Sequence, residues 1–116
     1  MLEPSSKSKV FLSTGYTDMR KGVHRLWLLV STLLKDQDSK EAVVVFRGKD
    51  ASKVKILWWD GQGFCLFYKC FDTGKIIWPS AKEDGTVGIT RAQLSMLLEG
   101  IDWRKPQWTS APKYIG

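Results

Sequence analysis

Four short runs rich in β-branched and aromatic residues fill the middle of the chain, and they constrain its fold more than any other feature. We expect strands over residues 42–46, 53–59, 64–71 and 75–78. The connections between them are short and rich in Gly and Asp, and such connections join antiparallel neighbours. The sequence therefore predicts a four-stranded antiparallel meander, which ends at Pro79 because proline cannot donate to a strand ladder.

Two helical patterns flank this meander. After Thr17, which is placed to act as an N-cap, apolar residues recur at spacings of three and four and so share one helix face. These residues are Met19, Val23, Leu26, Val30 and Leu33. A second helix is predicted to open with a capping box between Thr90 and Gln93 and to stop at Gly100. Its buried face would consist of Leu94, Leu97, Leu98 and Ile101.

A chain of 116 residues is the size of one domain, and the order of the elements indicates the α+β class. We expect a single domain in which an antiparallel four- or five-stranded meander packs against one N-terminal and one C-terminal helix, both on one face. A strand over residues 10–14 can join the sheet edge. We expect residues 1–9 to be a flexible leader, 10–102 to form the domain, and 103–116 to be an irregular tail containing Trp and Pro.

The charge balance favours a polyanionic partner. Eighteen Lys and Arg residues stand against twelve Asp and Glu, which gives a formal net charge of +6. A single histidine and two cysteines exclude a Cys/His zinc cluster and a multi-bridge disulfide scaffold, and we expect no metal and no other cofactor. No apolar run is long enough to span a bilayer, so we expect a cytoplasmic protein that does not bind a membrane.

The central hairpin suggests what kind of surface the domain presents. A loop of two or four residues would pair Trp59 with Phe64 and place lysines among aromatic rings on one sheet face. That face would carry Lys53, Lys55, Leu57, Trp59, Phe64, Leu66 and Tyr68, whereas the opposite, more apolar face would pack under the helices. Ammonium groups beside flat rings suit a phosphate backbone with stackable bases. The alternative is an ordinary amphipathic strand, with Lys53 and Lys55 solvated and the rings in a core.

Several residue runs, in a fixed order, resemble one known family. The first runs from Gly15 to Gly22 and reads G-Y-T-D-M-R-K-G. The others are Phe46-Arg47-Gly48, Lys55-Ile56-Leu57-Trp58-Trp59-Asp60-Gly61-Gln62-Gly63-Phe64, Tyr68-Lys69, Gly74-Lys75, Trp78-Pro79 and Leu97-Leu98-Glu99-Gly100-Ile101-Asp102. Together they are similar to the second-reading-frame accessory protein, of the TnpB type, of insertion-sequence-66 transposons. Tyr16, the turn Gly48-Lys49-Asp50 and Cys70-Phe71 depart from the family pattern.

The resemblance implies a helper of DNA transposition that acts beside a separate, larger transposase. The motif positions that coincide with the family are Asp18, Arg20, Lys21, Gly22, Lys55, Trp59, Asp60, Gly61 and Gly63. We expect Asp60 to Gly63 to be a hairpin turn rather than a metal or phosphate loop. Arg20 and Lys21, in the predicted first turn of a helix, could clamp a phosphate, and the alternative is that Arg20 pairs with Asp18.

The candidate site residues fall into two groups. For nucleic-acid binding they are Arg20, Lys21, Arg47, Lys53, Lys55, Tyr68, Lys69 and Arg104. For binding of a protein partner they are Trp59, Trp103 and Trp108, because Trp is enriched at interfaces.

The sequence is compatible with two functions. The first is a non-catalytic accessory protein of transposition that binds DNA mainly through phosphate contacts. The second is an adaptor that docks on the transposase without touching DNA. A nuclease is disfavoured, since Asp18, Asp60, Asp72 and Glu99 sit at turns and helix ends rather than converging on a metal. The sequence leaves open whether the chain forms a homodimer.

Overall fold

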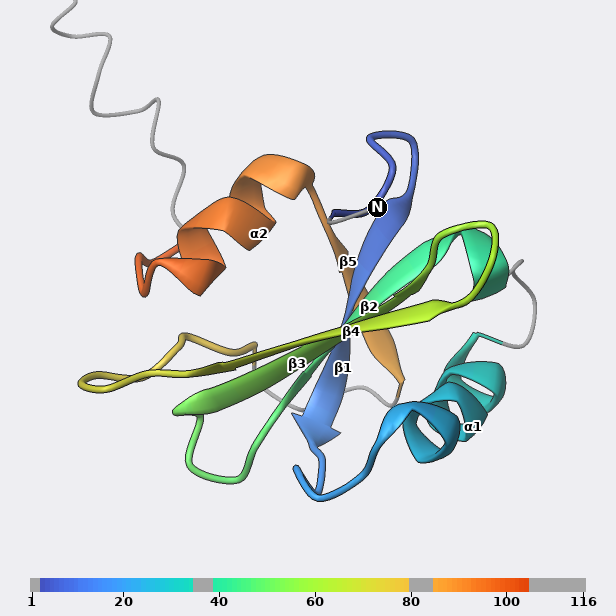
Figure 1. The fold of residues 1–116 in the computed structure, drawn as a ribbon. Coiled ribbons are helices and arrows are strands. Elements are labelled where there is room, and N and C mark those ends of the chain that lie inside the picture. The colour runs from blue at the N-terminus through green and yellow to red at the C-terminus, as the bar shows by residue number, and fades with distance from the viewer. Residues whose placement is uncertain (1–2, 35–38, 80–84, 105–116) are drawn as a thin grey trace, which may run out of the picture.

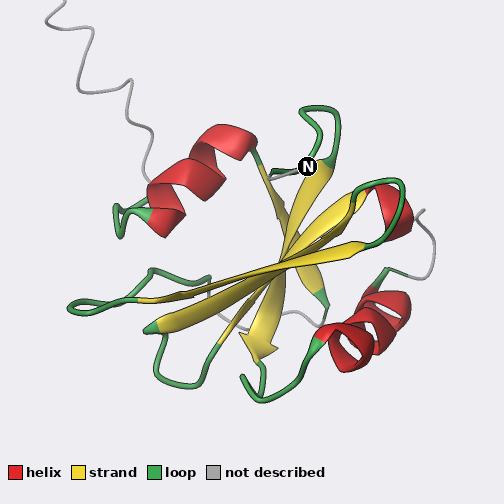
Figure 2. Cartoon of the chain, viewed as in Figure 1, coloured by secondary structure: helices red, strands yellow, loops and turns green. Residues whose placement is uncertain are grey.

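The computed structural model describes residues 3–34, 39–79 and 85–104. These residues form a five-stranded sheet with two α-helices and one short 3-10 helix (Figures 1 and 2). In chain order the elements are β1 (Lys9–Tyr16), α1 (Val23–Leu33), the 3-10 helix Ser39–Glu41, β2 (Ala42–Arg47), β3 (Lys53–Trp59), β4 (Phe64–Cys70), β5 (Thr86–Ile89) and α2 (Arg91–Leu98). Within the described ranges, neither helix is long and apolar enough to cross a bilayer.

The sheet is mixed rather than wholly antiparallel. Its strand order is β4-β3-β2-β1-β5, and the β2-β3-β4 meander is antiparallel as predicted. The strand before the first helix is not at an edge, because β1 lies between β2 and β5 and runs parallel to β2. Parallel pairing requires a crossover connection, and the segment containing α1 provides it.

The fourth predicted strand is wrong, and a different segment completes the sheet. Residues 75–78 form no strand, although the Ile76 amide donates to the Ala51 carbonyl at 2.9 Å and the Trp78 indole donates to the Ser13 carbonyl at 2.8 Å. The fifth strand is instead β5, which pairs with β1 and was not predicted. Its four residues, Thr86–Ile89, include a glycine and carry too short a pattern to read as a strand.

The two helices pack on opposite faces of the sheet, not on one face as expected (Figure 1). On one face, α1 contributes Leu26 and Val30 to a cluster with Val44, Phe46 and Leu57. On the other, α2 contributes Leu94 and Leu97 to a cluster that includes Val43, Val45, Ile56, Trp58 and Trp103. Successive side chains of β2 point to opposite faces of the sheet, and both faces are covered by a helix. Side chains on both faces of β2 are therefore buried, which explains its continuous apolar run.

The first helix begins later than predicted. Its N-cap is Gly22, and Thr17 precedes the helix as a buried residue whose amide donates to the Arg47 carbonyl at 2.8 Å. Between them, the Asp18 carboxylate accepts from the Arg20 amide at 2.9 Å and forms a turn. Arg20 and Lys21 therefore lie in a loop before α1, not in its first turn, and Gly22 is not inside the helix.

Two local predictions are confirmed. In the β3–β4 hairpin, Trp59 pairs with Phe64, and the Asp60 carboxylate accepts the amides of Gln62 and Gly63, both at 2.9 Å, within the turn. At α2 the capping box is complete: the Gln93 amide donates to Thr90 Oγ1 at 3.0 Å, and the Thr90 amide donates to Gln93 Oε1 at 2.9 Å. Ile101 lies beyond the helix and is 42% exposed, so it is not part of the buried face.

Candidate nucleic-acid interface

The sheet topology brings two distant parts of the sequence together at one end of the molecule. Parallel strands end at the same edge, and Tyr16 at the end of β1 pairs with Arg47 at the end of β2. The loop before α1 therefore meets the turn between β2 and β3. An open groove of about 750 Å³ lies between them, and we call it the Tyr16 groove. It is lined by Tyr16, Thr17, Asp18, Met19, Arg20, Gly48, Lys49, Asp50 and Lys53.

Several basic side chains lie in or beside this groove, which also carries an exposed aromatic ring. The Tyr16 side chain is 59% exposed, and the Lys49 ammonium and the Arg47 guanidinium each lie 6.0 Å from its ring centroid. Lys53 is exposed at the start of β3, and the Arg20 side chain is 91% exposed. Basic groups and a flat ring on an accessible surface are able to contact a phosphate backbone and an unstacked base.

The carboxylates of the groove are engaged in their own turns. Asp18 accepts from Arg20 Nε at 3.0 Å and Nη2 at 2.7 Å, and this hydrogen-bonded guanidinium holds the pKa of Asp18 far below its ordinary value. The carboxylate in turn raises the pKa of Arg20. The pairing of Arg20 with Asp18, the alternative to a phosphate clamp, is therefore present in the structure, and it fixes the direction in which Arg20 projects.

Asp50 makes the corresponding turn on the other wall of the groove. Its carboxylate accepts from the Ser52 amide at 3.1 Å and from the Ser52 hydroxyl at 2.8 Å, and these two hydrogen bonds lower its pKa. Each wall therefore carries one carboxylate that stabilises a tight turn and at least one exposed cation beside it.

Arg47 supports the groove from below. Its Nη1 donates to the carbonyls of Gly48 at 3.1 Å and Lys49 at 3.2 Å, so its guanidinium stabilises the turn between β2 and β3. Its Nε is buried and has no hydrogen-bond partner within the described part of the chain. Arg47 thus shapes the Tyr16 groove while its own side chain is only half-buried.

Lys55 does not lie on an open sheet face, in contrast to the prediction. It is 7% exposed, and its ammonium donates to the carbonyls of Met19 at 2.7 Å and Lys21 at 2.9 Å. The ammonium also lies 4.7 Å from the ring centroid of Tyr68. Lys55 is buried because α1 and its preceding loop cover that face, and it holds the loop that forms one wall of the groove.

The other predicted nucleic-acid residues lie outside the groove. Lys21 is half-buried in the loop. Tyr68 is 47% exposed on β4 under Lys55. Lys69 donates to the Leu98 carbonyl at 2.7 Å and so binds the C-terminal end of α2, on the opposite face. Arg104 pairs with Asp102 at 3.0 Å, close to the end of the described chain.

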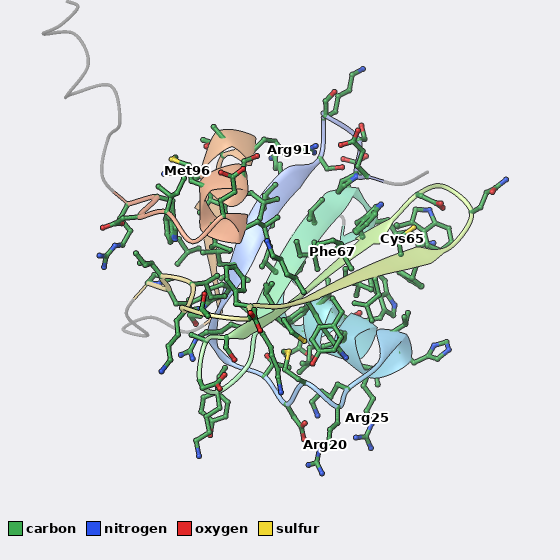
Figure 3. All side chains as sticks on the ribbon, turned by 60° about the vertical axis from the view of Figure 1, so that its left-hand side comes forward. Arg20, Arg25, Cys65, Phe67, Arg91 and Met96 are labelled. Atoms are coloured by element: carbon green, nitrogen blue, oxygen red, sulfur yellow. The ribbon has the colours of Figure 1, made fainter. Side chains whose placement is uncertain are left out.

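Sequence reasoning missed three residues here. Tyr16 and Lys49 line the groove, yet the sequence singled them out only as departures from the family pattern. Arg25, on the exposed side of α1, projects outward from the same side of the molecule as Arg20 (Figure 3). In the sequence, an aromatic residue at a strand end and a lysine in a turn are weak signals by themselves, and only the parallel pairing of β1 with β2 makes Tyr16 and Lys49 neighbours.

The predicted partner tryptophans differ in their surroundings. Trp59 is half-buried, with its ring 4.9 Å from the Phe64 ring and the Lys40 ammonium 4.6 Å from its centroid. The prediction that Trp103 binds a partner is wrong. Trp103 is 6% exposed, packs in the α2 cluster and donates to the Ile77 carbonyl at 2.6 Å, which leaves little surface for a partner. Trp108 lies outside the described residues. The predicted leader and tail boundaries stay predictions, although Trp103 itself belongs to the core.

Across residues 3–34, 39–79 and 85–104, no three or more His, Cys, Asp or Glu side chains gather in a way that could hold a metal ion. Both cysteines are free thiols. Burial, together with the Asp60 carboxylate 3.6 Å away, raises the pKa of Cys65.

The fold and the groove together describe a small α+β protein with a mixed five-stranded sheet and an open basic and aromatic surface at one end. The chain belongs to the family of IS66 Orf2-like proteins, whose model matches residues 8–108, and the family resemblance seen in the motifs is confirmed. The family indicates an accessory role in insertion-sequence transposition.

Two relatives from Sinorhizobium fredii (strain NBRC 101917 / NGR234) are similar over nearly their whole length. The uncharacterized protein y4hO is 47% identical over 116 residues, which covers 100% of both chains. The uncharacterized protein y4jC is 33% identical over 110 residues, which covers 91% of this chain and 93% of the relative. No solved structure gives a significant match.

Proposed function

We propose that this protein is a non-catalytic accessory factor of insertion-sequence transposition that binds DNA through the Tyr16 groove, beside a separate transposase. The observation that carries the proposal is that Arg20, Lys49 and Lys53 line one groove with the exposed Tyr16, whose ring centroid lies 6.0 Å from the Lys49 ammonium. Arg20 lies in the loop before α1, whereas Lys49 and Lys53 lie in the β2–β3 turn and at the start of β3, so this grouping of cations is a product of the fold rather than of one basic run.

The groove suits contacts to the sugar–phosphate backbone. Arginine and lysine side chains that neutralise phosphates release condensed counterions, and affinity that arises this way falls steeply as salt rises. The Arg20 side chain is 91% exposed, and its pairing with Asp18 already restricts its conformation. Binding of a phosphate would therefore cost Arg20 little additional side-chain conformational entropy. Tyr16 can stack on an unpaired base or pack against a sugar, which is tolerant of sequence. We therefore expect weak sequence preference.

A second candidate function is an adaptor that docks on the transposase without DNA. It is favoured by Leu28, which is 66% exposed on α1, since a large apolar side chain in solvent suits a protein partner. A half-buried Trp59 on the same sheet face as the α1 cluster is a further candidate contact.

One pair of experiments separates the two functions. Electrophoretic shifts of labelled duplex and single-stranded DNA, carrying either an element end or an unrelated sequence, would be measured over a salt series. DNA binding predicts a shift at low salt that weakens steeply as salt rises, with little difference between sequences. Absence of a shift at the lowest salt rejects it. Co-purification with the transposase that survives nuclease treatment would instead support the adaptor.

A further inference from the structure

β4 is a long edge strand, and within residues 3–34, 39–79 and 85–104 no strand pairs with its outer side. β4 pairs only with β3 and forms one end of the sheet, and all seven of its residues stay in register with β3 without a bulge (Figure 1). The other edge strand, β5, has four residues. An unpaired edge of this length presents a row of free backbone groups that can template another strand.

The hydrogen bonds at the two ends of the hairpin show which backbone groups of β4 are free. The Asp60 amide donates to the Gly63 carbonyl at 3.0 Å, and the Phe71 amide donates to the Ser52 carbonyl at 2.7 Å. In an antiparallel ladder, hydrogen-bonded residues alternate with unbonded ones. Cys65, Phe67 and Lys69 therefore bond to β3, and the outward groups belong to Phe64, Leu66, Tyr68 and Cys70.

The side chains of β4 do little to protect this edge. Natural sheets commonly block an edge with charged residues, proline or a bulge. β4 contains no proline, and its one charged residue, Lys69, is bound to the Leu98 carbonyl. Phe67, in the middle of the strand, is 42% exposed on the α2 face, where it lines a groove whose walls include Ile56, Trp58 and Leu98 as well as the charged residues Glu3 and Arg91. In Figure 3 the Phe67 label marks this position on the sheet.

We propose that β4 pairs antiparallel with β4 of a second copy, about a two-fold axis at Phe67. Phe67 is the midpoint of Phe64–Cys70, so all seven residues overlap only when it faces itself. In that register Leu66 faces Tyr68 of the second copy, and these are residues whose backbone groups point outward. The two five-stranded sheets then become one continuous sheet, and the closed two-fold interface covers the β4 edge of each copy.

Charge complementarity selects a second copy over an unrelated strand. The same register places Lys69 opposite Cys65 of the second copy. The Cys65 thiol lies 3.6 Å from the Asp60 carboxylate. In the dimer, a Lys69 ammonium that exchanges its bond to the Leu98 carbonyl therefore meets the Asp60 carboxylate of the second copy, and the two-fold axis repeats this contact. No like charges face each other along the strand, since Lys69 is the one charged residue of β4.

Sedimentation analysis of the full chain over a wide concentration series tests this interface. The wild type is expected to dimerise. Phe67→Lys, which sets two ammonium groups against each other on the axis, is expected to give a monomer with unchanged circular dichroism. Phe67→Leu is the control, because it keeps an apolar side chain on the axis, and it is expected to remain a dimer. A wild-type monomer at every concentration, or a dimer that persists in Phe67→Lys, would overturn the proposal.

A cross-link tests the register separately, and it also tests the β4–β4 interface if Phe67→Lys fails to fold. Directly opposed residues that share no backbone hydrogen bonds have Cβ atoms about 4.5–5.5 Å apart, close enough for a disulfide with small adjustments. Phe67→Cys in a Cys65→Ser/Cys70→Ser background is therefore expected to form a covalent dimer under mild oxidation. A chain that stays monomeric under oxidation contradicts the proposed register.

Discussion

The Lys55 ammonium donates a hydrogen bond to the Met19 carbonyl, 36 residues away in the chain, at 2.7 Å. A second bond to the Lys21 carbonyl, at 2.9 Å, ties the same ammonium to the loop that forms one wall of the Tyr16 groove. A lysine that sequence reasoning assigned to the nucleic-acid surface thus supports that surface from beneath.

Replacing this lysine should destabilise the fold. Lys55→Met keeps the apolar stem but removes the donor from two carbonyls, and a lost hydrogen bond to a charged group costs about 1.5–3 kcal/mol. The free energy of unfolding from urea titration measures the loss. Lys53→Met, at the exposed start of β3, is the matched control and should change stability little. Equal stability of the two variants would contradict the supporting role of Lys55.

The Asp18–Arg20 pair predicts a particular acid titration. The pKa of folded Asp18 lies below the ordinary value of 3.8, so its contribution to stability is complete above that value. The contribution fades as the pH falls through the lower, folded pKa. Because the pair is exposed, the effect on the free energy of unfolding is small, and carboxyl carbon NMR shifts are the better measurement.

In that titration the Asp18 midpoint should lie well below those of ordinary aspartates, and Arg20→Gln should move it upward. Arg104→Gln, which breaks the pair between Arg104 and Asp102, should leave the Asp18 midpoint unchanged. An Asp18 midpoint at the ordinary value in the wild type would show that the pair does not persist in solution.

Trp58 and Trp103, whose side chains are both buried, should respond differently to the loss of their indole N–H groups. Trp103 donates to the Ile77 carbonyl at 2.6 Å, whereas the Trp58 indole nitrogen has no partner in the described ranges. Trp103→Phe leaves a carbonyl without its donor, at a cost of about 1–3 kcal/mol in addition to lost packing. Trp58→Phe removes a donor that makes no bond, so it should cost less. Chemical denaturation compares them, and a larger loss for Trp58→Phe would be inconsistent with this assignment.

The capping box of α2 gives a further stability prediction. Thr90→Ala removes the acceptor of the Gln93 amide and should lower the free energy of unfolding by about 1 kcal/mol. Thr90→Ser keeps a hydroxyl acceptor and should be close to the wild type. Thermal unfolding of both variants measures the difference, and identical losses would show that the hydroxyl is not the stabilising group.

Local chemistry made part of the fold predictable. The Asp60 turn and the Thr90 capping box each depend on residues within three positions, and the sequence identified both. The start of α1 was predicted wrongly, because it depends on a residue that is distant in the sequence. Thr17 has the side chain of an N-cap, but its amide bonds to Arg47 in the neighbouring strand, so the helix starts after Gly22.

The candidate site was less predictable, because it depends on topology. Alternation along β3 correctly put Lys53 and Lys55 on one face, but it could not show that α1 and its loop cover Lys55 and leave Lys53 exposed. Likewise, only the parallel pairing of β1 with β2 brings Tyr16 to the turn that carries Lys49.

Two variants that lose the same charge show whether DNA binds at the Tyr16 groove. Lys49→Ala/Lys53→Ala removes two cations from the groove, and Lys7→Ala/Lys9→Ala removes two exposed cations from the other end of β1. Fluorescence anisotropy with labelled DNA over a salt series would compare both with the wild type. If DNA binds in the groove, the groove variant loses affinity and the slope of its affinity against salt falls by about 2, while the Lys7/Lys9 variant stays near the wild type. Equal losses in the two variants, or no loss in the groove variant, would contradict DNA binding in the groove.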